Sequence, residues 1–140
     1  VIDTGGMNPI TFMQKAPKPK IAVLANSIDY ALATDFFGFL QNKGMEVARI
    51  TAADFEKYKT TKFIVILGGP DAYEGVGDIV KQVLASDEQQ FLRTKGNRKM
   101  YVKTNVWATG QVVMVLAGSD REQTRLAHIE NRDEVSKKAS

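Results

Sequence analysis

The chain has 140 residues, of which 44% are hydrophobic and 25% are charged, and 19 basic and 16 acidic residues give a net charge of +3. This length fits one domain, and the composition is ordinary for a soluble globular protein. The two charge signs nearly balance without long single-sign runs, so the sequence argues against nucleic-acid binding. No apolar run approaches the roughly 18 residues of a membrane helix, and we expect no membrane contact within the chain.

Cysteine is absent, which excludes disulfides, thiol catalysis and thiolate metal sites. The chain begins with Val1 rather than methionine, and we interpret it as a fragment or a mature form. Whether a signal peptide or an anchor precedes Val1 therefore stays open.

Residues 1–19 are predicted to be an extension or linker, because Pro17 and Pro19 favour extended backbone. The α/β domain is predicted to span 20–140. It opens with a continuous apolar run at 21–25, typical of a strand buried on both faces.

A single helix is predicted to follow, from an N-cap at Ser27 to Lys43-Gly44, with Asp29 in its first turn. Its expected apolar stripe consists of Ile28, Leu32, Phe36, Phe39 and Leu40. A second strand is expected at 45–50. Thr51 and Asp54 then resemble a capping box that opens a short helix ending at Tyr58.

The second half begins with an apolar strand at 63–67, a loop at 68–77 and a helix. Ser86 with its following residues predicts a capping box for another short helix. Strands are expected at 100–106 and 111–117, joined by a tight turn as an antiparallel hairpin. Ser119 and Glu122 predict a third capping box, which opens a last helix with a fraying end.

This order of elements predicts an α/β fold. We expect a single three-layer domain of Rossmann-like or flavodoxin-like type, with a mainly parallel sheet and an antiparallel edge hairpin. The loops that leave the carboxyl ends of parallel strands meet at one edge, where ligands usually bind. The candidate ligand-binding residues in these loops are Asn26, Ser27, Gly69, Asp71, Ser119, Asp120 and Arg121.

Neither glycine-rich loop matches a phosphate-binding motif. Gly75-Val76-Gly77 lacks the third glycine of GxGxxG, and no Gly-Lys-Ser/Thr occurs. A tight turn that only glycine fits is the better interpretation of Gly68-Gly69-Pro70. Helix capping likewise explains Ser119-Asp120, although Arg121 or Arg125 could hold an anion at the helix start.

No complete catalytic or metal-binding constellation is visible, and we expect no cofactor. His128 is the only histidine, too far along the last helix for a catalytic triad and expected on a solvated face. Asp29, Asp71, Glu74 and Asp120 could converge on a hard cation, but helix N-terminal charges are the commoner explanation.

Two segments carry a family resemblance. The turn Gly68-Gly69-Pro70 after an apolar strand, together with AGSDREQTR at 117–125, resembles the carboxyl-terminal part of archaeal surface-layer (S-layer) proteins. The similarity covers about residues 62–127. It implies an extracellular, non-catalytic domain of the cell envelope with protein partners, and it identifies no catalytic residue.

Two functions therefore stay open. The first is a non-catalytic envelope domain that acts through protein–protein contacts at the cell surface. The second is a small-ligand or nucleotide-binding domain of flavodoxin-like type, with enzymatic activity and a cytoplasmic location not excluded. The sequence leans away from an enzyme because no set of catalytic residues is complete.

Overall fold

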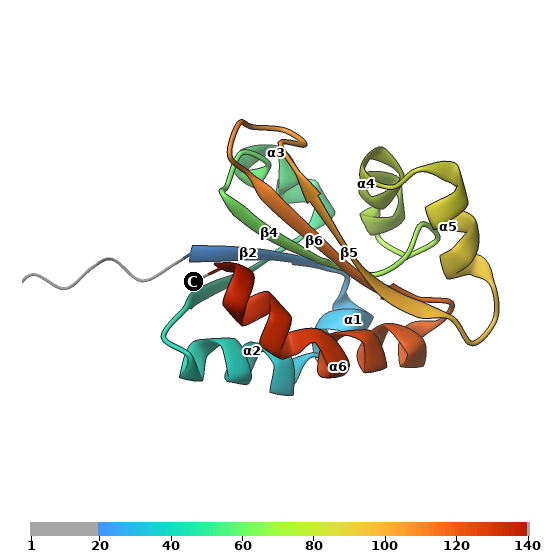
Figure 1. Ribbon diagram of the computed structural model, residues 1–140, viewed down its shortest axis with the longest axis horizontal. Coiled ribbons are helices and arrows are strands. Elements are labelled where there is room, and N and C mark those ends of the chain that lie inside the picture. Colours follow the sequence, from blue (N-terminus) through green and yellow to red (C-terminus); the bar gives the residue numbers. More distant parts are fainter. Residues whose placement is uncertain (1–19, 140) are drawn as a thin grey trace, which may run out of the picture.

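A computed structural model describes residues 20–139, which form one five-stranded sheet. Figure 1 shows that helices cover both faces of this sheet. The predicted extension at 1–19 lies outside the described residues. In chain order the elements are β2 (Lys20–Ala25), α1 (Ser27–Ala31), α2 (Thr34–Asn42), β3 (Glu46–Ile50), the 3₁₀ helix η2 (Ala52–Asp54), α3 (Phe55–Tyr58), β4 (Phe63–Leu67), α4 (Val76–Val83), α5 (Ser86–Arg93), β5 (Arg98–Thr104), β6 (Val112–Gly118) and α6 (Arg121–Ala139).

The sheet confirms the predicted topology. Its strand order is β3-β2-β4-β6-β5; the first four strands are parallel, and β5 is antiparallel to β6 at the edge. The central strands are the continuous apolar runs, and Val23, Val65 and Val115 are fully buried. The fold is therefore an α/β three-layer domain of Rossmann-like or flavodoxin-like type.

The two faces of the sheet carry separate cores. On one face Phe36 and Leu40 of α2 and Ala127 of α6 pack against the sheet. On the other, Phe55 of α3 and Val80 of α4 do so. The chain thus leaves β2 toward one face and β4 toward the other (Figure 1). These neighbouring strands form the topological switch point, where ligands bind in open α/β sheets.

The single helix predicted from Ser27 to Lys43 is wrong, because the chain breaks at Leu32-Ala33 into α1 and α2. The N–H of Leu32 still bonds to Ile28, and the N–H of Ala33 bonds to Tyr30, which tightens the end of α1. The break rotates the buried stripe, so Leu32 is 37% exposed and Ala33 is buried instead.

Three of the four predicted helix caps are wrong by one residue. Asn26, not Ser27, caps α1, and Asp120, not Ser119, caps α6 through a bond from the N–H of Gln123. Glu88 accepts the N–H of Ala85, so the box of α5 begins before Ser86. At Thr51 the predicted N-cap is confirmed, since its hydroxyl accepts the N–H of Asp54.

The last helix is longer and better packed than predicted. It continues to Ala139, and Val135 and Ala139 are buried against the sheet rather than fraying. His128 is 1% exposed and packs against the ring of Phe36, so the expectation of a solvated histidine is wrong. None of the helices in residues 20–139 is long and apolar enough to cross a membrane.

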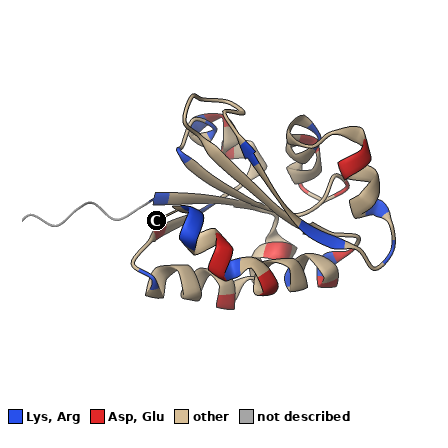
Figure 2. Ribbon diagram, in the orientation of Figure 1, with Lys and Arg blue, Asp and Glu red and all other residues tan. Residues whose placement is uncertain are grey.

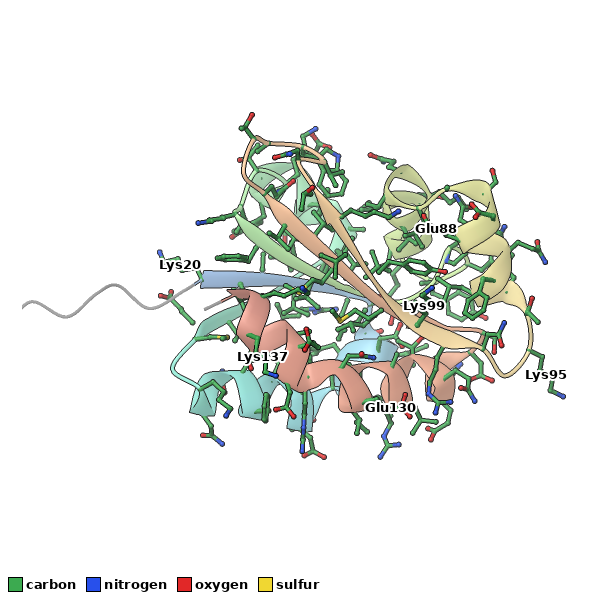
Figure 3. The ribbon with its side chains drawn as sticks, viewed as in Figure 1. Lys20, Glu88, Lys95, Lys99, Glu130 and Lys137 are labelled. Carbon is green, nitrogen blue, oxygen red and sulfur yellow. The ribbon has the colours of Figure 1, made fainter. Side chains whose placement is uncertain are left out.

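Two basic residues tie the edge strand β5 to both helical layers. Arg98 pairs with Glu130 of α6 at 2.6 Å, and Lys103 pairs with Glu88 of α5 at 2.7 Å. Figure 3 labels the two acidic partners, which lie on opposite sides of the sheet. Figure 2 shows both charge signs along α6, consistent with a mixed surface rather than a basic stripe.

Candidate functional site

A crevice of about 390 Å³ opens at the carboxyl edge of the sheet, over the switch point between β2 and β4. Its volume lies within the range of small-molecule sites. The lining comes from the ends of β2, β4 and β6, from α1, from the loop after β4, from α5 and from the start of α6. The residues are Asn26, Ile28, Asp29, Gly68, Gly69, Pro70, Asp71, Ala72, Tyr73, Leu92, Arg93, Gly118, Ser119, Asp120, Arg121 and Thr124.

Asn26 joins the end of β2 to the rest of the crevice. Its Oδ1 accepts the N–H of Asp29 at 2.7 Å, which caps α1, and its Nδ2 donates to the carbonyl of Tyr73. The side chain is 4% exposed. Asn26 therefore positions two loops, and little of its hydrogen-bonding capacity is left for a ligand.

Ser27 does not line the crevice, because it turns toward the loop after β4. Its N–H and its hydroxyl both donate to the Glu74 carboxylate. These bonds lower the pKa of Glu74 and hold it in a left-handed conformation at φ 61°. A non-glycine residue there is strained, so the Ser27 contact fixes the shape of this loop.

The glycines of the GGP loop serve close packing, which agrees with the tight-turn interpretation. A Cβ on Gly77 would lie 2.5 Å from the carbonyl oxygen of Pro70, and Gly68 adopts φ +139°. A Cβ on Gly69 would lie 3.3 Å from the carbonyl oxygen of Gly118, so the ends of β4 and β6 approach closely. Substitution at these positions would distort the crevice floor.

Asp71 is held by a residue that the sequence did not indicate. Arg93 at the end of α5 donates two bonds to its carboxylate, at 2.9 and 3.1 Å. The Arg93 hydrogen bond lowers the pKa of Asp71. This ion pair spans the crevice wall and neutralises both charges.

The loop between β6 and α6, which contains Ser119 and Asp120, is held by hydrogen bonds to neighbouring protein groups. Asp120 accepts the N–H of Gln123 at 2.8 Å as N-cap, and Ser119 accepts the N–H of Gly96 at 2.9 Å. Buried Thr124 accepts the N–H of Gly118 at 3.1 Å. Ser119 thus joins the loop before β5 to the end of β6 and is no helix cap.

Asp29 and Arg121 differ from Asp71 and Arg93 because they form no ion pair among the described residues. Asp29 is 6% exposed, and burial raises its pKa to about 6, although the Asn26 hydrogen bond and the charge of Arg121 act in the opposite direction. Arg121 is exposed at the rim. Neither forms an ion pair with any residue in 20–139. A buried carboxylate in a crevice is a recognised mark of a functional site.

Most of the candidate residues meet as the sequence predicted, and the crevice lining includes Asn26, Gly69, Asp71, Ser119, Asp120 and Arg121. From the sequence, Asp29 is explained mainly as a helix N-terminal charge, Tyr73 is a possible partner contact, and nothing indicates Arg93. The position of Asp29 in the crevice could have been inferred, because Asp29 follows the end of a predicted strand by only four residues. Arg93 lies on a helix 22 residues from Asp71, and no local pattern points to it.

Metal binding and triad chemistry gain no support from the described part of the chain. Within it no group of three or more His, Asp and Glu side chains could hold a metal ion. His128 lies seven residues beyond Arg121, about 10 Å along α6, and is absent from the crevice lining. Its Nδ1 is buried without a hydrogen-bond partner among the described residues.

No protein-family model matches the amino-acid sequence, and no curated protein matches it.

Proposed function

We propose that this chain is a non-catalytic domain of a cell-envelope protein that acts through protein–protein contacts at the cell surface. The resemblance of its GGP turn and its AGSDREQTR segment to archaeal surface-layer proteins motivates the assignment.

One observation carries the non-catalytic part of this proposal. The polar side chains of the three loops bond to neighbouring protein groups: Asn26 to Asp29, Ser27 to Glu74, Asp71 to Arg93, Ser119 to Gly96 and Asp120 to Gln123. A nucleophile or general base must instead face the substrate within hydrogen-bond reach. The loops use their polar groups to hold one another in place.

Two measurements test this proposal. Intact cells that produce the protein are treated with a membrane-impermeant biotin reagent, and the chain should be labelled through exposed lysines such as Lys57 and recovered with the envelope fraction. A cytosolic protein of known location serves as the control. Recovery with the soluble fraction, without labelling, would contradict the location.

The second measurement concerns catalysis. The purified chain should hydrolyse ester, phosphoester and glycoside substrates no faster than the heat-denatured protein. Turnover that is lost on Asp29→Asn would contradict a non-catalytic domain.

A small-ligand-binding domain of flavodoxin-like type is the second candidate. The observation that favours it is the position of the 390 Å³ crevice at the switch point, with a buried carboxylate in its lining. A thermal-shift screen with nucleotides, phosphosugars and amino acids distinguishes the candidates. Saturable stabilisation by one compound supports the second.

A further inference from the structure

The charges that line the crevice fall into two groups. Asp71 and Arg93 neutralise each other through two hydrogen bonds, and Asp120 is occupied as the N-cap of α6. Asp29 and Arg121 have no ion-pair partner between residues 20 and 139, although the charge of Arg121 acts to lower the pKa of Asp29. The crevice thus contains one buried carboxyl group and one exposed guanidinium that are not held in an ion pair.

These two groups lie at different depths. Asp29 is buried, and its Oδ2 lies 3.5 Å from the position of a Cβ on Gly68 at the end of β4. Arg121 is exposed at the first residue of α6, where the helix dipole adds to its positive charge. An unpaired carboxylate is costly to bury, so a cation delivered by a ligand would be stabilised at Asp29.

We propose that the crevice binds a small zwitterion, such as a free α-amino acid, with its ammonium group on Asp29 and its carboxylate on Arg121. This inference rests on the ligand-binding candidate and is independent of the envelope assignment. A ligand with only a negative charge would be repelled by the Asp29 carboxylate. A ligand with only a positive charge would form no contact with Arg121. Tyr73, 64% exposed at the crevice, offers an apolar surface to the ligand side chain.

Titration of ¹⁵N-labelled protein with glycine, L-leucine, L-glutamate and L-lysine tests the proposal. At least one amino acid should bind saturably and shift the amide signals of Asn26, Gly68 and Gly69. Its N-acetyl and its amide derivatives, which lack one charge each, should bind about tenfold or more weakly, the range of a lost charged contact.

Matched variants locate the two contacts. Asp29→Asn should abolish measurable binding, and Arg121→Gln should weaken it about tenfold. Asp35→Asn, in the first turn of α2, and Arg125→Gln, one turn along α6, should leave the affinity unchanged. Arg121 is exposed, so its variant keeps the test valid should Asp29→Asn fail to fold.

The affinity should also fall about tenfold from pH 7 to pH 5, because Asp29, with its pKa of about 6, is mostly protonated at pH 5. The charged groups that act on it are Arg121 and Glu74. The other charged groups in the lining are Asp71, Arg93 and Asp120. A pH-independent affinity would overturn the assignment of the ammonium group to Asp29.

Three further results would overturn the proposal. Nucleotide or phosphosugar binding without amino-acid binding would keep the ligand-binding candidate and reject the zwitterion. No binding of any of these compounds would reject both. Amino-acid binding that survives both Asp29→Asn and Arg121→Gln would place the ligand elsewhere.

Discussion

The two ends of the sheet bury polar side chains in opposite ways. At the amino end, Gln111 is 1% exposed; its amide donates to the carbonyls of Lys59 and Thr61, and its oxygen accepts the N–H of Trp107. At the carboxyl end, buried Asp29 has no ion-pair partner within the described chain, and burial raises its pKa although the charge of Arg121 acts in the opposite direction. One end of the sheet is closed by a satisfied neutral network, and the other has a buried carboxyl group without an ion-pair partner beside a crevice. The polar groups at the amino end therefore satisfy one another, whereas the burial of Asp29 at the carboxyl end costs free energy.

Removal of the satisfied network should have the largest effect. Gln111→Leu leaves the Lys59 and Thr61 carbonyls and the Trp107 N–H without partners, and each unsatisfied group costs about 1–3 kcal/mol. We expect a loss of about 4 kcal/mol in the free energy of unfolding, measured by urea denaturation. Gln89→Leu, which removes the bonds from α5 to the carbonyls of Lys81 and Leu84 at the end of α4, should cost less than about 1 kcal/mol. Equal losses would show that burial does not matter here.

His128 provides a second buried polar group for the comparison, since its Nδ1 has no partner in residues 20–139. Burial lowers its pKa to about 4, Arg125 acts in the same direction, and Asp35 opposes them. The unfolded chain therefore binds the proton more readily, and the contribution of His128 to the free energy of unfolding should fall by about 3 kcal/mol as pH falls from about 6.5 to 4. His128→Leu should remove this loss in denaturation curves recorded across that range. An unchanged pH profile would refute the assignment.

Asp29 should show the opposite sign. Its folded pKa of about 6 lies above the usual 3.8, so the native state is penalised as pH rises from about 4 to 6, by about 2–3 kcal/mol. Asp29→Asn should raise stability at pH 7 by about that amount and leave it unchanged below pH 4. In the unaltered chain the effects of His128 and Asp29 largely cancel, so each substitution should expose a slope that was hidden. A loss of stability at pH 7 would mean that Asp29 is neutralised in solution.

The smallest effects concern the caps at the carboxyl end. Asp120→Ala removes the N-cap of α6 and should cost about 1 kcal/mol in thermal denaturation. Ser119→Ala loses only a half-exposed bond from the N–H of Gly96 and should cost about 0.5 kcal/mol. The reverse order would restore Ser119 as the cap that the sequence predicts.

The sheet could be predicted from the sequence because its central strands are continuous apolar runs separated by turn residues. Strand 63–67 agrees in both bounds, and the hairpin of β5 and β6 follows from the tight turn between two strands. The caps could not be fixed, since Asn26 and Ser27, like Ser119 and Asp120, are adjacent residues of equal capping ability. The residue at which the preceding strand ends determines which of the two becomes the N-cap. The end of a strand in turn depends on its pairing with strands that are distant in the sequence.

The location of the crevice could be predicted from the sequence, but the interactions of its side chains could not. Parallel strands bring their carboxyl ends together whatever residues follow, so Asn26, Gly69 and Arg121 meet by topology. The partner of Asp71 is set by the packing of α5, which no local pattern encodes. The sequence does not indicate that His128 is buried, and its ring packs against Phe36 of α2, which is distant in the sequence.

The place of β6 in the sheet has a consequence for synthesis of the chain. Among the described strands β6 is made last, yet it lies between β4 and β5. Until residues 112–118 leave the ribosome, β4 has an open edge and β5 has no strand to pair with. A nascent chain that stalls before Val112 would expose the apolar edge of β4, the kind of surface that recruits chaperones or other strands.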